Sequence, residues 1–288
     1  MKRNTRGFSR SMLARILAGA VALLTVVACT PSGGHVAPSV AGSTVIPGGG
    51  VKIGIAIDEP GISLKQGMEY SGFDIITAIY VAAKLGVPEA NITWVPVDKA
   101  DRETALESGE VDLVIASYSM TDERKQRVDF AGPYFVAHQD LLIRRNDDTI
   151  TGPETLNGKT LCSPTGTTSA AYIKQNYRGS ITLREVPTLS ECVRDLAHGD
   201  VDAVTDDDVI LAGFASQPEY KGILRVLERG FTNESYGVGI KKGDANLVTH
   251  VSAALKDYIS SGAWSQALKT NVGPSGYDVP EPPTVTTG

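Results

Sequence analysis

The chain alternates short runs of apolar, β-branched residues with longer stretches in which apolar residues recur at helical spacing. In the first half, strands are expected at 51–57, 92–97 and 111–116, and helices at 73–83 and 102–107. In the second half, strands are expected at 160–162, 181–186 and 201–204, and helices at 168–177 and 189–197. Alternating strands and helices predict β-α-β units with parallel strands. We therefore expect an α/β fold of two lobes, each a central, mostly parallel sheet flanked by helices.

Two segments of the chain repeat the same nine-residue frame. LESGEVDLV (106–114) and LAHGDVDAV (196–204) share the pattern L-x-x-G-[DE]-V-D-x-V. The glycine stands where a helix ends, and Val-Asp-x-Val opens the next strand. Such joints are common in α/β proteins, so nine residues can also match by chance. We interpret the repeat as one plan used in both lobes.

The amino terminus has the layout of a secretory signal peptide, assigned to residues 1–28. Basic residues between Lys2 and Arg15 precede an apolar run at 16–28 that is too short to span a bilayer comfortably as a mature helix. The run ends in Val-Val-Ala-Cys, which resembles the lipobox of bacterial lipoproteins and makes Cys29 the expected site of lipidation. An ordinary signal peptide with a chance cysteine is the alternative. Acyl chains such as palmitate would anchor Cys29, since each buried CH₂ contributes about 0.8 kcal/mol.

Two further segments have compositions that do not favour a packed core. Residues 29–50 are rich in Gly, Pro, Ser and Thr and are expected to form a flexible tether after the lipidated cysteine. Residues 273–288 have a similar composition and are expected to form a disordered tail. The folded part of the chain is therefore expected to lie between residues 51 and 272.

Charge and motif content exclude several classes of function. A net charge of −6 argues against nucleic-acid binding, which needs a basic surface to neutralise phosphates. No Ser-His-Asp elbow, phosphate-binding loop or metal-ligand set is apparent, so we expect no catalytic residue, cofactor or metal. With Cys29 lipidated, Cys162 and Cys192 remain in a chain sent to a disulfide-permissive compartment. We expect them to form a disulfide rather than remain free thiols or bind zinc.

Polar residues follow the last strand of each predicted series. The segment 117–121, with Arg124 just beyond it, follows the strand at 111–116, and the segment 205–208 follows the strand at 201–204. In open α/β sheets ligands bind at the carboxyl ends of strands, so these segments are expected to face each other across a cleft. A planar guanidinium suits a carboxylate, and the acidic segment suits an ammonium. The pair predicts a site for a small zwitterion.

Several motifs, in this order and spacing, resemble the polar amino-acid solute-binding proteins of ABC importers (solute-binding family 3), and within them the glutamate-binding lipoproteins. The resemblance covers essentially all of 51–270. Its most specific parts are Gly72-Phe73-Asp74, LESGEVDLVIASYSMTDERKQRVDFAGPYF, LCSPTGTTSAAYIK, VDAVTDDDVILAGF and YGVGIKK. It implies a two-lobed, type II periplasmic-binding-protein-like fold with a two-segment hinge near 134–138 and 235–239. Lobe 1 would comprise 51–136 and 239–272, and lobe 2 would comprise 137–238.

The resemblance also implies roles for individual residues at the carboxylate end of a ligand. Arg124 matches the family position whose guanidinium holds the α-carboxylate, supported by Ser119 and by the backbone of Ser117. Arg102 matches a position with which glutamate and aspartate binders neutralise the side-chain carboxylate. Asp58 matches a cleft position that is an acid in glutamine-type binders, and it would repel a γ-carboxylate unless it pairs with Arg102 or faces the ammonium.

The second lobe is expected to supply the rest of the site. Asp207 matches the carboxylate that receives the α-ammonium, although the choice among Asp206, Asp207 and Asp208 rests on the alignment alone. Thr165, Thr167 and Thr168 match a loop at a helix amino terminus, where free N–H groups and hydroxyls help to bind an anion.

These residues lead to one main function and two alternatives. We expect an extracytoplasmic monomer, lipid-anchored to the outer face of the membrane, that binds an amino acid by hinge closure and delivers it to the permease of an ABC importer. L-Glutamate is the first choice of ligand, ahead of aspartate, glutamine and asparagine. A sensor that signals through a membrane partner is one alternative. A dehydratase-like enzyme on the same fold is a remote second.

Overall fold

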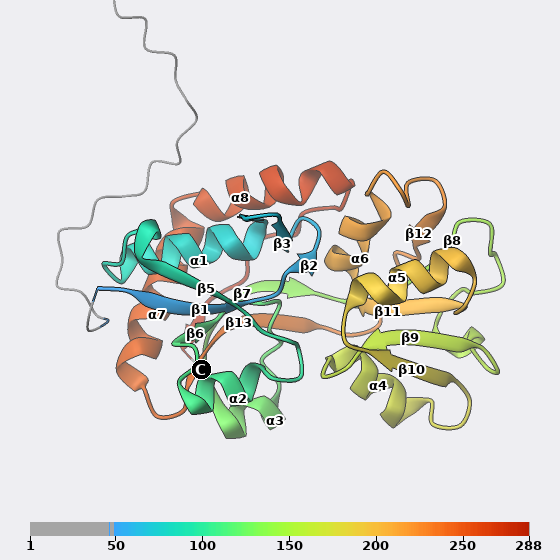
Figure 1. Cartoon of the computed structure of the whole chain (residues 1–288), viewed down its shortest axis with the longest axis horizontal. Helices are drawn as coiled ribbons and strands as arrows, with labels where there is room; N and C mark the ends of the chain where they lie inside the picture. The colour runs from blue at the N-terminus through green and yellow to red at the C-terminus, as the bar shows by residue number, and fades with distance from the viewer. Residues whose placement is uncertain (1–45, 47–48, 288) are drawn as a thin grey trace, which may run out of the picture. The chain divides into compact units, whose positions relative to one another are not determined.

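The computed structural model describes residue 46 and residues 49–287, so Cys29 and the expected signal peptide lie outside the described residues. Two central sheets and one small sheet organise this part of the chain (Figure 1). The first sheet has the strand order β14 (Thr286–Thr287), β7 (Val128–Ala137), β13 (Glu234–Lys241), β6 (Leu113–Val114), β1 (Val51–Ile55) and β5 (Ile92–Pro96). The second has the order β10 (Thr182–Val186), β9 (Thr160–Pro164), β11 (Ala203–Asp207), β8 (Gln139–Arg144) and β12 (Leu224–Val226). The small sheet has the order β2 (Asp58–Glu59), β3 (Ser63–Gln66) and β4 (Glu69–Ser71).

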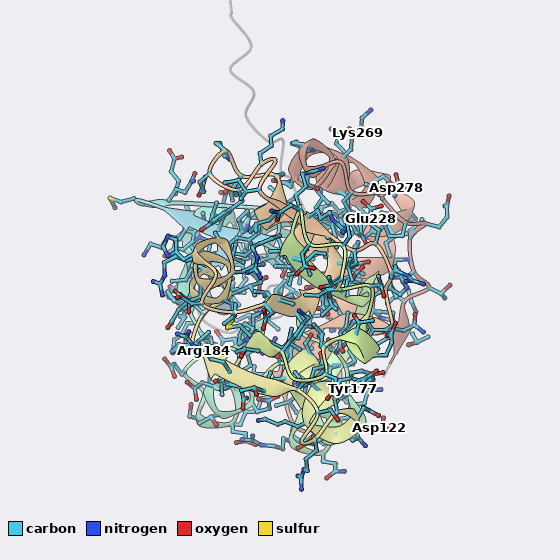
Figure 2. The ribbon with its side chains drawn as sticks, turned by 90° about the vertical axis from the view of Figure 1, so that its right-hand side faces the viewer. Asp122, Tyr177, Arg184, Glu228, Lys269 and Asp278 are labelled. Carbon is cyan, nitrogen blue, oxygen red and sulfur yellow. A yellow bond between two sulfur atoms is a disulfide. The ribbon has the colours of Figure 1, made fainter. Side chains whose placement is uncertain are left out.

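Helices cover both faces of each central sheet, as Figure 1 shows. One face of the first sheet packs on α1 (Phe73–Lys84), α7 (Ala245–Ser260) and α8 (Ala263–Asn271), and the other packs on α2 (Arg102–Ser108) and α3 (Asp122–Arg127). The second sheet lies between α5 (Leu189–His198) with α6 (Asp208–Ala215) and α4 (Thr168–Asn176). The 3₁₀ helices are η1 (Glu89–Asn91), η2 (Pro153–Thr155) and η3 (Gly273–Ser275). Exposed charged side chains such as Asp122, Lys269 and Asp278 lie at the periphery of this core (Figure 2).

The expected two-lobed α/β architecture is present, but its sheets are mixed rather than mostly parallel. β1 runs parallel to β5 and β6, and β9 runs parallel to β10 and β11. Every other pairing in the two central sheets is antiparallel. The sequence pattern predicts the local β-α-β units, whereas the antiparallel strands arrive from distant parts of the chain and leave no local periodic signal.

The repeated nine-residue frame corresponds to a repeated local structure. Asp112 Oδ2 accepts a hydrogen bond from the backbone N–H of Lys52 at 2.8 Å, and Asp202 Oδ2 accepts one from the backbone N–H of Thr160, also at 2.8 Å. In both cases the aspartate fixes the start of the central parallel strand of its sheet. The glycine before it, Gly109 or Gly199, ends the preceding helix with a φ of +77° or +90°. The strand orders β5-β1-β6 and β10-β9-β11 repeat the same plan.

The chain passes between the two sheets on an antiparallel pair of long strands. β7 ends at Ala137 and β8 begins at Gln139, so His138 alone separates the first sheet from the second on this passage. β13 pairs with β7 from Glu234 opposite Ala137 to Lys241 opposite Val128. This pair is the structural counterpart of the expected two-segment hinge.

The segment after α8 differs from the expected disordered tail over 273–288. Residues 273–275 form η3, the Tyr277 hydroxyl donates to Asp208 Oδ2 at 3.1 Å, and β14 pairs with Gly132 and Ala131 of β7. The free edge of β7 and the partly buried Asp208, which accepts from the tyrosine hydroxyl, stabilise this segment despite its content of Pro and Gly. Composition alone does not register either interaction.

A disulfide joins the two cysteines of the second sheet region. Cys162 in β9 and Cys192 in α5 are both buried and bonded; their Cα atoms are 5.5 Å apart, and the two residues are 30 positions apart in sequence. The bond ties a helix to the central strand of the sheet that it covers.

We expect the Cys162→Ala, Cys192→Ala double variant to lose about 3 to 4 kcal/mol of unfolding free energy, because a closed loop of this length restricts the unfolded chain. Urea unfolding of both proteins, each measured with and without a thiol reductant, checks this. If the reductant destabilises the double variant as much as it destabilises the wild type, the assignment to this bond is contradicted.

Candidate functional site

The carboxyl ends of strands from the two central sheets meet at one place. Loop residues after β1, β5 and β6 contact loop residues after β9 and β11 and the start of α5. The contacts include Asp58 Oδ2 with the N–H and hydroxyl of Ser190, both at 3.2 Å, and Lys99 Nζ with Asp206 Oδ2 at 3.8 Å. A cavity of about 500 Å³ opens here, and its lining includes Lys99, Glu103, Arg124, Thr168 and Glu234. This is where an α/β sheet binds its ligand.

Arg124, in α3, reaches from the first sheet toward the second. Its Nη1 donates to the carbonyl of Ser119 and its Nη2 to the carbonyl of Gly166, each at 2.9 Å. Its Nε lies 3.3 Å from Glu103 Oε1. Burial, together with the charge of Arg102, lowers the pKa of Arg124 to about 10, so the side chain remains a cation at neutral pH.

Arg102 begins α2 and is buried. Its Nε donates to the carbonyl of Lys99 at 3.0 Å and its Nη1 to the carbonyls of Ala116 at 3.0 Å and Ser117 at 3.4 Å. The guanidinium lies over the ring of Tyr118, 4.5 Å from its centroid, and that of Arg124 lies 5.1 Å from the same centroid. One aromatic ring therefore supports both cations by cation–π contact.

Both guanidiniums donate to a single carbonyl oxygen. Arg102 Nη2 lies 3.4 Å and Arg124 Nη2 lies 2.9 Å from the oxygen of Gly166. Glycine is required at this position, since it has a φ of +81° and a Cβ would lie 2.5 Å from the Cα of Ala100. The loop after β9 thus places an acceptor against the two predicted anion-binding residues.

The second sheet supplies buried acids. Asp207 is the last residue of β11, and the hydroxyl of Tyr236 donates to its Oδ2 at 2.5 Å. Burial raises the pKa of Asp207 well above its ordinary value, and the nearby carboxylates Asp206 and Glu234 raise it further. Among the described residues, Asp207 Oδ1, Asp206 Oδ2 and Gln139 Oε1 are buried acceptors with no hydrogen-bond partner. Gln139 pairs with Asp207 across β8 and β11, so these acceptors gather at one end of the sheet.

Sequence reasoning missed the ion pair formed by Lys99 and Glu59. Glu59 is fully buried, contacts Lys99 Nζ, and accepts from the hydroxyl of Ser117 at 3.0 and 3.1 Å. Burial opposes the charged form of Lys99, but the carboxylates of Asp206 and Glu59 raise its pKa. One cation shared by two acids leaves a surplus negative charge, and burial raises the pKa of Glu59 despite Lys99. Glu59 follows β1 and Lys99 follows β5. The expectation that ligands bind at the carboxyl ends of strands, used for Ser117 and Asp207, therefore applies to them as well.

The two acids after β1 have different surroundings. Asp58 makes its hydrogen bonds to Ser190 at the start of α5 and none to Arg102 among the described residues. Glu59 instead bonds to Lys99 and Ser117. A role of Asp58 toward the ligand stays a prediction.

The three threonines of the second-lobe loop have different surroundings. Thr168 lines the cavity, and its hydroxyl donates to Glu234 Oε2 at 3.0 Å. Thr167 caps α4, where its Oγ1 accepts from the N–H of Ala170 at 3.0 Å. Thr165 is exposed, and its backbone N–H donates to the carbonyl of Val186 at 2.9 Å. Thr167 and Thr168 both line the cavity, and the hydroxyl of Thr168 bonds to another side chain there.

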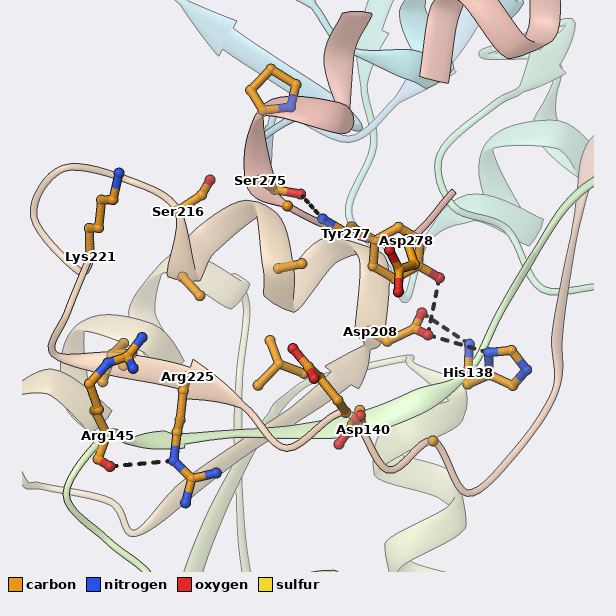
Figure 3. A pocket seen from close by; sticks show the side chains of 18 of the residues that line it. His138, Asp140, Arg145, Asp208, Ser216, Lys221, Arg225, Ser275, Tyr277 and Asp278 are labelled. Atoms are coloured by element: carbon orange, nitrogen blue, oxygen red, sulfur yellow. Dashed lines mark hydrogen bonds and ion pairs between the residues drawn. The ribbon is translucent and has the colours of Figure 1, made fainter. Parts of the chain in front are cut away.

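A larger cavity of about 760 Å³ lies between α6, β12 and residues 274–280, away from most of these strand ends (Figure 3). Two acids that line it already have partners. Asp208 contacts His138 and accepts from Tyr277, and Asp140 accepts from the N–H groups of Leu141 and Arg229. We therefore take the smaller cavity as the candidate site. Arg124 and Gln139 line it, whereas Arg102, Asp206 and Asp207 are buried and are not among its lining residues.

The described residues contain neither a candidate metal site nor a candidate membrane-spanning helix. No group of three or more His, Cys, Asp or Glu side chains there is arranged to hold a metal ion. Between residues 49 and 287, no helix is both long and apolar enough to cross a membrane.

Comparison with known proteins places the chain in a family. Residues 51–274 match the family described as bacterial extracellular solute-binding proteins, family 3. The chain is 38% identical over 287 residues to the glutamate-binding protein GluB of Corynebacterium efficiens, covering 96% of this chain and 95% of that protein. It is 30% identical over 201 residues to the ABC transporter glutamine-binding protein GlnH of Bacillus subtilis, covering 70% and 72%.

A solved structure agrees with these matches. An ancestral arginine-binding protein bound to arginine is similar with a TM-score of 0.73 and 29% identity, covering 77% of this chain and 98% of that one. The family and these relatives are binding proteins. The chain therefore belongs to the bacterial extracellular solute-binding proteins, family 3.

Proposed function

We propose that the chain binds L-glutamate between its two central sheets and delivers it to an ABC importer. The observation that carries this proposal is the convergence of two guanidiniums on the carbonyl of Gly166, together with buried oxygens of Asp207 and Gln139 that have no hydrogen-bond partner among the described residues. A zwitterion matches both halves of such a site. The relatives named for glutamate and glutamine binding support a polar amino acid.

Each charged group of glutamate has a matching partner. Arg124 would bind the α-carboxylate, and Asp207, with Gln139 beside it, would accept the α-ammonium. Arg102 would bind the side-chain carboxylate. Arg102 forms no ion pair among the described residues. Asp58, the acid that could have cancelled the charge of Arg102, bonds to Ser190 instead.

Carboxylate ligands would also have to compete with the Gly166 carbonyl for both guanidiniums. A carboxylate forms charge-assisted bonds with guanidinium that are shorter and stronger than those of a neutral carbonyl. This exchange favours a ligand with two carboxylates over one with a single carboxylate. Glutamate is therefore the first choice, ahead of aspartate, glutamine and asparagine.

We expect calorimetric titration of the purified, ligand-stripped protein to give binding of L-glutamate, and Arg124→Ala to abolish it, because loss of the partner of a buried charge costs on the order of 2 to 5 kcal/mol. Arg102→Ala should weaken binding of glutamate and aspartate more than binding of glutamine and asparagine. Lys125→Ala, an exposed change in the same helix, is the control and should leave affinity unchanged. An equal loss for glutamate and glutamine in Arg102→Ala would contradict the assignment of the side-chain site, and turnover of an amino acid by the protein would contradict a purely binding role.

The raised pKa of Asp207 predicts that glutamate binding is linked to protons. A ligand ammonium favours the ionised carboxylate, so binding lowers the pKa of Asp207 and releases a proton from the fraction that carries one. Affinity should therefore fall as the pH is lowered through the range in which Asp207 becomes protonated. Calorimetry in two buffers of different ionisation enthalpy measures the protons released. The control is Asp208→Asn, which alters the neighbouring acid bonded to His138 and Tyr277 and should keep the same pH dependence. An affinity of the wild-type protein that does not change across this range would contradict the prediction.

We also propose that Cys29, outside the described residues, carries the lipid that holds the protein at the outer face of the membrane. Cys29→Ser in the full chain should move the protein from the membrane fraction to the soluble fraction and reduce uptake of labelled glutamate by whole cells. Retention in the membrane fraction would contradict the lipid anchor. Unchanged uptake in cells that lack the protein altogether would contradict delivery to an importer.

A further inference from the structure

Asp74, the acid of the Gly72-Phe73-Asp74 motif, is fully buried near the start of α1. Each of its carboxylate oxygens has one hydrogen-bond donor. The backbone N–H of Ser117 donates to Oδ2 at 2.7 Å, and the hydroxyl of Tyr134 donates to Oδ1 at 2.9 Å. Asp74 thus joins a residue of the ligand-binding loop to a residue of β7.

Ser117 is held in an unfavourable backbone conformation. Its φ of +44° lies in the left-handed region, which costs a residue with a Cβ about 1 to 2 kcal/mol. The bond from its N–H to Asp74 and the bonds from its hydroxyl to Glu59 hold it there. Of these, only the bond to Asp74 acts directly on the backbone.

The conformation of Ser117 decides where the carbonyls of its loop point. The carbonyls of Ala116 and Ser117 accept from Arg102, and the carbonyl of Ser119 accepts from Arg124. A Ser117 relaxed to negative φ would turn these acceptors away from the two guanidiniums. The guanidiniums would then lose the bonds that fix their direction.

We infer that Asp74 is a positioning residue for ligand binding: by holding Ser117 in the left-handed conformation, it orients the loop carbonyls that aim Arg102 and Arg124 at the ligand. The inference rests on the proposed binding of an amino acid. The Tyr134 hydroxyl fixes the carboxylate of Asp74 in turn, and the Tyr134 carbonyl accepts from Trp264 Nε1 at 2.7 Å. The aim of the two arginines is therefore set from β7, the strand that passes between the sheets.

Glycine at position 117 offers a specific test, since glycine adopts positive φ without the cost of a Cβ. Asp74→Ala removes the acceptor of the Ser117 N–H, which the amide oxygen of asparagine could still provide. This variant should weaken L-glutamate binding by about tenfold or more, which corresponds to about 1.4 kcal/mol. Ser117→Gly added to Asp74→Ala should restore much of this affinity. Ser117→Ala in the same background removes the same hydroxyl but keeps the Cβ, and it should restore none.

The measurement is calorimetric titration of each variant with L-glutamate, after circular dichroism has shown that each is folded. Equal affinities of the Gly and Ala double variants, or wild-type affinity of Asp74→Ala, would overturn the inference while leaving the proposed function intact. Absence of binding by the wild-type protein would overturn both. Should Asp74→Ala not fold, Tyr134→Phe removes only the hydroxyl that orients Asp74, and the same comparison of Gly with Ala at position 117 is made in that background.

Discussion

The antiparallel pair β7 and β13 is the constraint on which the rest of the structure depends, because both central sheets are joined through it. Each of these strands carries a tyrosine whose hydroxyl donates to a buried acid. Tyr134 of β7 donates to Asp74 on the side of the first sheet, and Tyr236 of β13 donates to Asp207 on the second. The two rings lie 6.1 Å apart between centroid positions. The backbone that would bend in hinge closure therefore also holds one acid on each side of the site.

Buried acids around the site exceed the buried cations near them, and this surplus has an energetic cost. Burial raises the pKa values of Glu59, Asp74 and Asp207, in the case of Asp74 to about 7, because each carboxylate loses water and neighbours another acid. Lys99 offsets part of the charge from its place between Glu59 and Asp206. An ammonium bound at Asp207 would offset more of this negative charge. The surplus of buried acids would therefore favour a ligand that carries a cation.

Sequence reasoning predicted what is local and missed what is distant. The β-α-β units and the joints at Gly109 and Gly199 follow from periodicity and from glycine chemistry, and the Asp112 and Asp202 bonds explain why the repeated frame includes an aspartate. The antiparallel strands and the ordered segment after α8 depend on partners far away in sequence. The ion pair of Glu59 with Lys99 was missed because its two members are far apart in sequence, and a pattern of polar residues does not say which of them meet in the fold.

The shared carbonyl of Gly166 connects selectivity to the contact between the sheets. Two guanidiniums over one tyrosine ring repel each other, and the charge of Arg102 contributes to the lowered pKa of Arg124. A neutral carbonyl between them offers a dipole but no charge, so the repulsion remains. An anion at the same place would remove it and would strengthen the bonds to both side chains. A ligand with a second carboxylate would gain from this relief of repulsion, and its amide counterpart would not. Discrimination between the two ligands would then arise from a repulsion already present in the protein. No further residue is needed to recognise the second charge.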